Sequence, residues 1–505
     1  MYRRVLAFAF VAGVCHSCIP RDFGSGSVVC VCNSTHCDFT PKLNTPNEGT
    51  FLHYVSSKAG QRLSPSDGTF SNETIEGASL IVNKNKKYQT MHGFGGAFTD
   101  SAGINIKGLR PAAQEFLLQS YFGKNGSEYN LGRTPIGGTD FSLRPYELDD
   151  HENDYELKYF SLTQEDYIYK IPLMQRALEI NPELKFLAAA WSAPPWMKVD
   201  NRYVGYGHLQ QKYYQTYANY LIKFLDAYKS HGLKMWTIST GNEPNDAILE
   251  IKSFNSMGWT FEELSQWVAN NLGPTLKASQ HNETIIIGLD DQRCFVPWYI
   301  SKIFENEKVR SYVSGIGLHW YTDEYFPPIL LDWTHDQFPD KFLITTESCV
   351  VPFLDYNKVV LGSWERAEYY ILYMIQNINH WVSGWVDWNL ALNMEGGPNW
   401  AKNAADAAII VNAEKDEFYK QPIFYAIAHF SKFIPRGSTR VDITNHNDIK
   451  AMAFTTPENE TVTIVYNTYV NDNYVLIEDD IYYENLMKRN GFLLQSEYAT
   501  EREHQ

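Results

Sequence analysis

Basic residues are scarce in this chain. Its 505 residues include 43 Lys and Arg against 59 Asp and Glu, which gives a formal net charge of −16 at pH 7. Nucleic-acid binding depends on clustered Lys and Arg that neutralise phosphates. The sequence therefore argues against a nucleic-acid partner.

Several catalytic signatures are also missing. The chain contains no Gly-x-Ser-x-Gly elbow, no His-Glu-x-x-His motif and no P-loop. The glycine run at 93–96 lacks the third glycine of a dinucleotide-binding fingerprint. These absences disfavour the corresponding hydrolases, zinc proteases and nucleotide-binding enzymes, and we expect neither a cofactor nor a metal ion.

Long apolar runs are limited to the N-terminus. Two arginines precede the short apolar stretch Val5–Val14, and small residues follow near Ser17. This stretch is too short to span a bilayer and is typical of a cleaved signal peptide over residues 1–17. No other segment of that length lacks charge, so we expect a soluble mature protein that contacts membranes only peripherally. Five Asn-x-Ser/Thr sequons agree with passage through the secretory pathway: Asn33, Asn72, Asn125, Asn282 and Asn459.

Four cysteines crowd the mature N-terminus. In a secreted protein, two disulfides are the natural interpretation, most simply Cys18–Cys30 and Cys32–Cys37. A zinc site is the alternative, although the Cys-x-Cys-x4-Cys spacing and an oxidising compartment both disfavour it.

From residue 88 onward, apolar strands alternate with amphipathic helices, which is the pattern of a parallel barrel. The helical spacing is clearest at Gln211–Ser230, Phe261–Leu272 and Arg366–Asn379. Eight strands are predicted at Met91–Phe98, Tyr129–Ile136, Lys185–Trp191, Lys234–Thr240, Thr284–Leu289, Ser314–Trp320, Lys341–Thr346 and Val382–Trp388. We therefore predict an α/β fold, a (β/α)8 TIM barrel.

Both ends of the chain have a different pattern. Short alternating segments fill residues 18–87, and Ala451–Phe454 and Thr461–Tyr466 are strand-like. Because neither end can form a core alone, we expect them to meet in an accessory β-sandwich-like domain, with Gln421–Phe433 as a helix on the barrel. The predicted boundaries are 18–43 for a small disulfide-bearing N-terminal β-sheet, 44–87 with 438–505 for the accessory domain, and 88–437 for the catalytic barrel with insertions.

Two glutamates follow buried strands. Glu243 lies in Lys-Met-Trp-Thr-Ile-Ser-Thr-Gly-Asn-Glu-Pro, and Glu347 in Lys-Phe-Leu-Ile-Thr-Thr-Glu-Ser-Cys. Each should project from the carboxyl end of its strand, on the fourth and seventh strands of one barrel. That arrangement is typical of the acid and the nucleophile in glycoside hydrolysis, and the amide of Asn242 could bind the sugar 2-hydroxyl. The alternative is a pair of ordinary solvated carboxylates.

Other strand ends add polar and aromatic groups to the same face. They are Asp140, Trp191, His319 with Tyr321, and Trp388. A sugar pocket needs carboxylates or amides for hydroxyls and aromatic rings for the apolar sugar face. Taken singly, each also has an ordinary structural role, as barrel packing, a buried histidine or a helix cap. Arg133, at the end of the second predicted strand, could pair with Glu347 or serve a purely structural ion pair.

Several long strings of residues carry a family resemblance. They are Gly-Phe-Gly-Gly-Ala-Phe-Thr-Asp at 93–100, Leu-Asp-Asp-Gln-Arg at 289–293, Leu-Gly-Ser-Trp-Glu-Arg at 361–366, Asp-Trp-Asn-Leu-Ala-Leu-Asn at 387–393, Glu-Gly-Gly-Pro-Asn-Trp at 395–400 and His-Phe-Ser-Lys-Phe-Ile-Pro at 429–435. With them, the chain resembles the glucosylceramidases of glycoside hydrolase family 30 from Cys18 to about Tyr466.

The resemblance implies roles for individual residues. Glu243 would be the general acid/base and Glu347 the nucleophile, with His319 and Tyr321 flanking the pair. The residues that would bind the glucosyl unit are Asp140, Trp191, Asn242, Trp388 and Asn403. The paired cysteines of the family match Cys18 with Cys30 and Cys32 with Cys37.

The implied reaction is retaining hydrolysis of glucosylceramide to glucose and ceramide, for which the two carboxyl groups should lie about 5–5.5 Å apart. The implied setting is the lysosome, reached through the secretory pathway, with secretion as another destination. The implied partners are glucosylceramide in anionic lipid membranes and a saposin-type activator protein.

Two departures from the family keep alternatives open. Gly241 precedes the Asn-Glu pair where a family member has glutamate, and the chain after Asp479 has a charged, weakly patterned tail in place of further strands. One alternative is a sister family 30 enzyme that cleaves a polysaccharide such as xylan or a β-1,6-glucan. The other is a non-catalytic lipid- or glycan-binding relative.

Overall fold

The structure is a computed structural model that describes residues 17–41, 45–70, 78–205, 207–245, 254–350, 358–446, 449–468 and 475–479. Residues 1–16 of the predicted signal peptide, the sequon at Asn72 and the charged tail after Asp479 lie outside the described residues. Of the other sequons, Asn125, Asn282 and Asn459 are exposed and Asn33 is partly buried.

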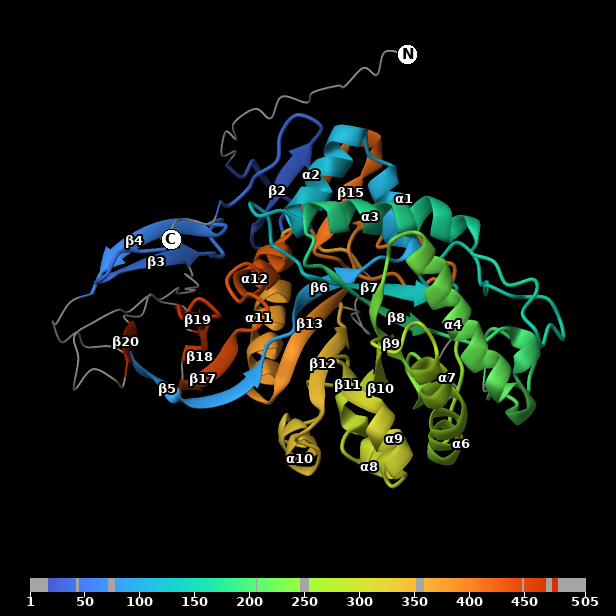
Figure 1. Cartoon of the computed structure of the whole chain (residues 1–505). Coiled ribbons are helices and arrows are strands. Elements are labelled where there is room, and N and C mark those ends of the chain that lie inside the picture. Colours follow the sequence, from blue (N-terminus) through green and yellow to red (C-terminus); the bar gives the residue numbers. More distant parts are fainter. Residues whose placement is uncertain are drawn as a thin grey trace, which may run out of the picture.

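A closed barrel of eight strands forms the centre of the molecule (Figure 1). Its strands are β6 Gly93–Ala97, β7 Leu131–Ile136, β8 Lys185–Ala190, β9 Met235–Ser239, β10 Ile285–Gln292, β11 Val313–His319, β12 Phe342–Glu347 and β13 Val382–Asn389. Neighbouring strands are parallel and follow one another around the barrel, and β13 closes it by pairing with β6. All eight strands predicted from the apolar runs are confirmed.

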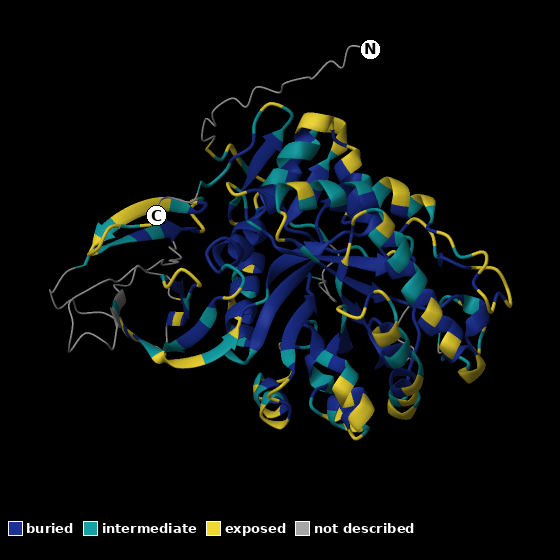
Figure 2. Cartoon of the chain, viewed as in Figure 1, coloured by how far each residue is buried: buried dark blue, intermediate teal, exposed yellow. Residues whose placement is uncertain are grey.

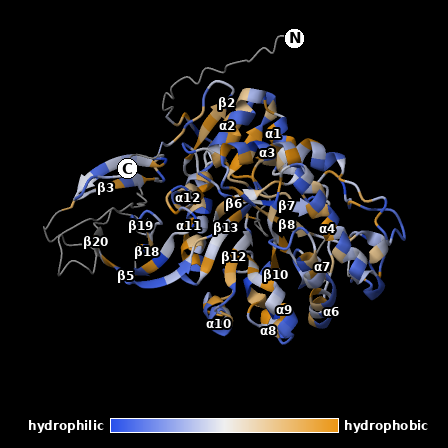
Figure 3. Ribbon diagram, viewed as in Figure 1, coloured by the Kyte–Doolittle hydropathy of each residue, from blue (hydrophilic) through white to orange (hydrophobic). Residues whose placement is uncertain are grey.

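These runs form strands because both of their faces are covered. Side chains point into the barrel on one face and against the surrounding helices on the other, so nearly every strand residue is buried (Figure 2). Hydrophobic residues accordingly concentrate on the strands and on the inner sides of the helices, as Figure 3 shows. The barrel thus presents polar side chains mainly where its strands end.

Helices surround the barrel. The predicted helical stretches correspond to α4 with the short turn before it, to α6 with the π-turn after it, and to α11. The α-helices are α1 Asp100–Lys107, α2 Pro111–Phe122, α3 Ile171–Ile180, α4 Tyr214–Ser230, α6 Phe261–Trp267, α7 Gly273–Ala278, α8 Trp298–Phe304, α9 Glu307–Tyr312, α10 Ile329–Gln337, α11 Trp364–Asn379 and α12 Pro422–Ser431. Helix α12 contacts α11 and β6, as predicted for a helix packed on the barrel. Across the described part of the chain, no helix combines the length and apolar character needed to cross a bilayer.

A five-stranded sheet carries the N-terminal cysteines. It is built from β1 Pro20–Asp22, β2 Val28–Asn33, β14 Leu392–Asn393, β15 Ile409–Asn412 and β16 Glu417–Lys420, in the order β1-β2-β16-β15-β14. The predicted disulfides Cys18–Cys30 and Cys32–Cys37 are both present. They replace the alternative zinc site, because oxidised sulfurs are not thiolate ligands. Three of the strands come from the far end of the barrel segment, which sequence analysis did not anticipate.

A second five-stranded sheet lies beside the barrel (Figure 1). Its strands are β5 Ala78–Thr90, β17 Thr439–Ile443, β18 Ile449–Thr455, β19 Thr461–Asn467 and β20 Val475–Asp479, in the order β19-β18-β17-β5-β20. The two ends of the chain therefore meet in an accessory β-domain, as the predicted fold class states. Within the described residues, strands β3 Thr50–Val55 and β4 Ser64–Thr69 form a separate two-stranded sheet. The exact domain boundaries stay a prediction.

Candidate active site

The two glutamates lie at the carboxyl ends of the barrel strands. Glu347 is the last residue of β12, and Glu243 lies four residues beyond the end of β9. The backbone of Glu243 has a φ of +46°, in the left-handed region that favours glycine. Its amide donates to the carbonyl of Asp290 at 2.9 Å, which stabilises this turn. Strained backbone of this kind is concentrated at functional sites.

The two carboxyl groups face each other across a histidine. One oxygen of Glu243, one oxygen of Glu347 and a ring nitrogen of His319 all lie within 4.8 Å of one another. The three residues are only 4%, 6% and 1% exposed, respectively. The fold thus brings together two residues that are 104 positions apart in the printed sequence.

Glu347 is held by an arginine and a tyrosine. Arg133 Nη1 donates to one carboxylate oxygen, and the Tyr321 hydroxyl donates to the other at 2.8 Å. Burial, together with the nearby Cys349 and Glu347, raises the pKa of Tyr321 well above its usual value, so the phenol keeps its proton. The pairing of Arg133 with Glu347 is confirmed, but Arg133 lies inside β7 and not at its end.

Arg133 also joins Glu347 to the rest of the site. Its Nη2 donates to Asn242 Oδ1 at 2.7 Å and to Asp290 Oδ2 at 3.1 Å. A single guanidinium therefore orients the nucleophile candidate and the amide next to Glu243 in one plane.

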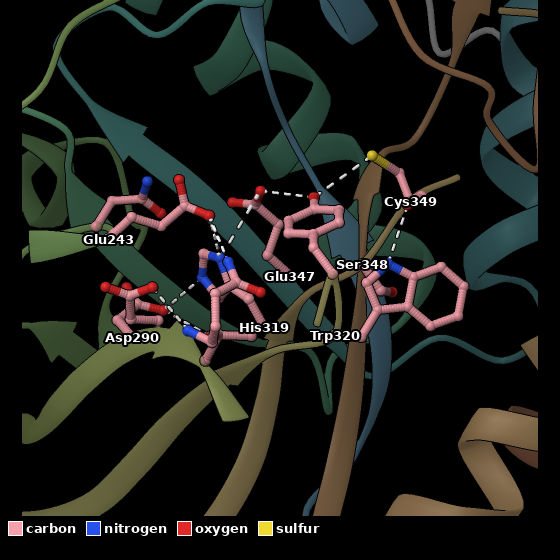
Figure 4. A network of polar contacts seen from close by, with 12 residues as sticks. Glu243, Asp290, His319, Trp320, Glu347, Ser348 and Cys349 are labelled. Atoms are coloured by element: carbon pink, nitrogen blue, oxygen red, sulfur yellow. Dashed lines mark hydrogen bonds and ion pairs between the residues drawn. The ribbon is translucent and has the colours of Figure 1, made fainter. Parts of the chain in front are cut away.

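Glu243 receives two hydrogen bonds on the same oxygen. Gln292 Nε2 and His319 Nδ1 each lie 2.9 Å from Oε1. The other ring nitrogen of His319 lies 3.3 Å from Asp290 Oδ1, so the imidazole stands between two carboxyl groups (Figure 4).

These contacts fix the charge of the histidine. Burial alone would favour the neutral ring, but the nearby Glu347, Asp290 and Glu243 raise the pKa of His319 to about 10. Burial likewise disfavours the Asp290 carboxylate, yet Arg133 and His319 hold its pKa below its usual value. Both ring nitrogens of His319 therefore donate, and Asp290 is an anion.

The charges of the cluster leave one proton for the glutamates. Two cations, Arg133 and His319, face three carboxyl groups, of which Asp290 is ionised. The buried cluster is neutral when one of Glu243 and Glu347 carries a proton. In this arrangement Arg133 donates to Glu347 and His319 donates to Glu243, so each glutamate has one cationic partner.

The same residues are poorly arranged for a metal ion. A protonated imidazole has no lone pair to offer, because His319 donates to a carboxyl group through each nitrogen. The arrangement instead suits proton transfer between carboxyl groups and a bound substrate.

The predicted sugar-binding residues gather beside the glutamates. Trp191 and Trp388 stack with their ring centroids 5.1 Å apart, and Arg133 lies over both rings. Asn403 Nδ2 donates to Asp140 Oδ2 at 2.8 Å. Asn403 Oδ1 is buried and accepts no hydrogen bond from the part of the chain that the structure describes. An unsatisfied amide oxygen beside a carboxylate suits recognition of a hydroxyl group.

Asp290 and Gln292 were missed by the sequence interpretation as site residues. They lie at the end of β10 inside the string Leu-Asp-Asp-Gln-Arg, which was used only for the family resemblance. Asp290 also accepts from Thr346 Oγ1 at 2.5 Å, so it links β12 to β10. A carboxylate at the end of a fifth barrel strand was the signal that could have identified it.

Known proteins match this chain over most of its length. Residues 91–434 match the glycosyl hydrolase family 30 TIM-barrel domain, and residues 437–482 match the family 30 beta sandwich domain. The lysosomal acid glucosylceramidase of Mus musculus is 41% identical over 471 residues, which cover 92% of this chain and 91% of that protein.

Two solved structures are also similar to this chain. SrfJ from Salmonella typhimurium superimposes with a TM-score of 0.79 at 29% identity, covering 86% of this chain and 95% of that one. The endo-β1,6-glucanase BT3312 gives a TM-score of 0.77 at 27% identity with the same coverage.

A closed parallel barrel with paired buried glutamates at the ends of its fourth and seventh strands is the framework of a glycoside hydrolase, and this protein is one. Within that class, the chain belongs to glycoside hydrolase family 30.

Proposed function

We propose that the protein is a retaining β-glucosidase that hydrolyses glucosylceramide to glucose and ceramide. The observation that carries this proposal is the close approach of Glu243 and Glu347, whose nearest oxygens lie within 4.8 Å. Retaining enzymes place the two carboxyl groups about 5–5.5 Å apart, whereas inverting enzymes leave about 6.5–9.5 Å for a water molecule. The short separation favours a covalent glycosyl-enzyme intermediate.

In the first step, Glu347 attacks the anomeric carbon, and the bond between the anomeric carbon and the ceramide oxygen breaks. Glu243 gives its proton to the ceramide oxygen. In the second step, water attacks the anomeric carbon and releases Glu347, while Glu243 takes the proton from the water. Arg133 and Tyr321 support this assignment because both donate hydrogen bonds to Glu347 and hold its carboxylate in position.

The remaining pocket residues would bind the glucosyl unit. In this proposal Asp140 and Asn403 bind sugar hydroxyls, Asn242 binds the 2-hydroxyl, and the stacked pair Trp191 and Trp388 contacts the apolar face of the ring. His319 contacts Glu243 and holds it in position for proton transfer.

The choice of glucosylceramide rests on the mouse enzyme, whose name states that substrate and which matches 92% of this chain. By the same likeness we propose action in the lysosome at the surface of anionic lipid membranes, with a saposin-type activator as partner and glycans on the predicted sequons. The competing candidate is a family 30 glycanase, favoured by the structural match to an endo-β1,6-glucanase.

A substrate panel separates these candidates. The secreted protein is offered glucosylceramide in anionic liposomes, a soluble aryl β-glucoside, a β-1,6-glucan and xylan, from pH 4 to pH 7. We expect cleavage of the first two, with release of β-glucose and higher rates at acidic pH. Cleavage of a polysaccharide alone would make the protein a glycanase, and a folded sample inactive on all four would favour the non-catalytic relative.

A further inference from the structure

The first turn of helix α1 lies against the segment that carries Asp140. Ser101 donates to the carbonyl of Phe141 through its amide at 3.0 Å. Its hydroxyl lies within hydrogen-bond distance of two carbonyls, that of Phe141 at 2.7 Å and that of Pro398. The Asp100 carboxylate accepts from Ser142 Oγ at 2.6 Å and from the Tyr146 hydroxyl at 2.9 Å. Two consecutive residues of α1 thus contact the two residues that follow Asp140.

Trp400 also donates hydrogen bonds to the segment Thr139–Ser142. Trp400 donates through its amide to the carbonyl of Asp140 at 3.2 Å and through its indole nitrogen to the carbonyl of Thr139 at 2.7 Å. Inside the segment, the amide of Thr139 donates to Ser142 Oγ at 3.0 Å. Ser142 therefore connects Asp100 to the backbone next to Asp140, because its hydroxyl donates to Asp100 and accepts from the amide of Thr139.

The same turn of α1 reaches the other wall of the pocket. Thr99, the N-cap of α1, donates to Asn389 Oδ1 at 2.6 Å, and Asn389 ends strand β13 next to Trp388. Phe141 meets Trp388 edge to face with ring centroids 6.2 Å apart. Residues 99–101 consequently connect the side of the pocket that carries Asp140 to the side that carries Trp388.

Asp100 also lies next to a buried lysine, Lys170. It is 3% exposed, and Lys170 Nζ lies 3.8 Å from its Oδ1 and 2.7 Å from Asp166. The lysine belongs to a π-helical turn, Asp166–Lys170, of the kind often found at functional sites. Removing a carboxylate from water costs solvation free energy. A buried carboxylate held by several partners therefore points to a role for its position.

We propose that Asp100 and Ser101 are positioning residues of the sugar pocket, which set the place of Asp140 against Asn403 and of Phe141 against Trp388. They touch no substrate, and they act through the backbone of Thr139–Ser142. The inference rests on the proposed function only in taking the bound sugar to be a glucosyl unit.

The test uses the full-length protein with Asp100→Ala, and Asp100→Asn as the conservative variant, whose amide oxygen can still accept from Ser142 and Tyr146. The control is Tyr228→Phe, which removes a 2.7 Å hydrogen bond to Asp166 in the same buried cluster and leaves the hydrogen bonds of Asp100 with Ser142 and Tyr146 in place. Kinetics with a soluble aryl β-glucoside are combined with hydrogen exchange of the peptide that covers residues 137–146.

For Asp100→Ala we expect KM to rise about tenfold with kcat changed less than about threefold, because binding of ground state and transition state weakens together. Exchange in the 137–146 peptide should accelerate. Asp100→Asn should stay within about threefold of the wild-type KM, and Tyr228→Phe should leave both readouts unchanged. In an Asp140→Ala background, Asp100→Ala should add less than about twofold to KM, since the two residues act as one unit.

An unchanged KM and exchange rate in Asp100→Ala, or fully additive effects with Asp140→Ala, would overturn the proposal. If Asp100→Ala does not fold, Ser101→Ala supplies the test, with an expected rise in KM of about threefold and faster exchange. A wild-type protein that fails to cleave the aryl glucoside would count against the proposed function, while hydrogen exchange would still decide whether Asp100 positions the segment.

Discussion

Two of the buried charge clusters in this protein use the same kinds of residues differently. The cluster that we propose to be catalytic, called the catalytic cluster below, consists of Arg133, Glu243, Asp290, His319 and Glu347. The support cluster consists of Asp100, Asp166 and Lys170.

In the catalytic cluster, three carboxyl groups share two cations, so one proton can move without leaving a net buried charge. In the support cluster, Lys170 faces two carboxyl groups. Asp100 also accepts from the hydroxyl groups of Ser142 and Tyr146, and Asp166 accepts from the Tyr228 hydroxyl and from the amide and hydroxyl of Thr163. The comparison indicates that buried charge serves reactivity in the first cluster and geometry in the second. Four predictions test this distinction.

Replacing the proposed nucleophile should have the largest effect. Glu347→Gln should lower kcat by a factor on the order of 10⁴ or more, because among the described residues no other carboxylate is assigned to form the covalent intermediate. The matched control is Glu365→Gln on the exposed side of α11, which should be as active as wild type. A fluorinated glucoside inactivator should label Glu347 in peptide mass spectrometry. Labelling of Glu243 would reverse the assigned roles.

Removing the cation of each cluster should separate activity from stability. Arg133→Met and Lys170→Met each leave buried carboxylates without their partner, and each should lower the free energy of unfolding by about 3–5 kcal/mol. Only Arg133→Met should also reduce turnover of the aryl glucoside by more than about 100-fold, whereas Lys170→Met should stay within about tenfold. Urea unfolding and steady-state kinetics measure both quantities. Equal losses of activity would erase the distinction between the clusters.

The catalytic cluster should also make stability depend on pH through His319. Its pKa is raised to about 10, from an ordinary value of 6.5, so its stabilising contribution is complete below pH 6.5 and is lost as the pH rises toward 10. The difference in unfolding free energy between wild type and His319→Gln should therefore shrink between pH 6 and pH 9.5, by an amount on the order of 3 kcal/mol. A difference that stays constant over this range would show that the buried ring is neutral.

A matched pair of tyrosines gives the smallest expected difference. Tyr321→Phe removes a donor to Glu347, and Tyr228→Phe removes a donor to Asp166. The first should lower kcat about tenfold, because a hydrogen bond to a charged group contributes about 1.5–3 kcal/mol. The second should lower only the unfolding free energy, by about 1 kcal/mol. Side-by-side kinetics and thermal unfolding would reveal whether Tyr228 also affects turnover, which this interpretation does not allow.

The barrel was predictable because its strands are marked by local sequence. Runs such as the one before Glu347 are apolar or β-branched and end in polar residues, and strands buried on both faces have that pattern. The N-terminal disulfides were equally accessible, since the four cysteines lie within twenty residues of one another. The pairing of β2 with β16 was not, because pairing between distant strands has no local signal.

The candidate site was predictable only in part, for the same reason. Glu243 and Glu347 stand out because each follows its own strand, and Arg133 was identified as a possible partner of Glu347. The role of Asp290 as the common partner of Arg133, His319 and Thr346 depends on three different strands. Lys170 and Asp100, which are 70 positions apart, carry no sequence pattern that joins them.

The sequence by itself determined the strands, the places where they end and the chemical groups found there, because strand formation depends on short-range apolar periodicity and burial. Only the tertiary structure decided which charges meet, how many protons they hold and which segments support Asp140. Those properties depend on distances between residues far apart in the chain and on exclusion of water, and both arise only when the barrel closes.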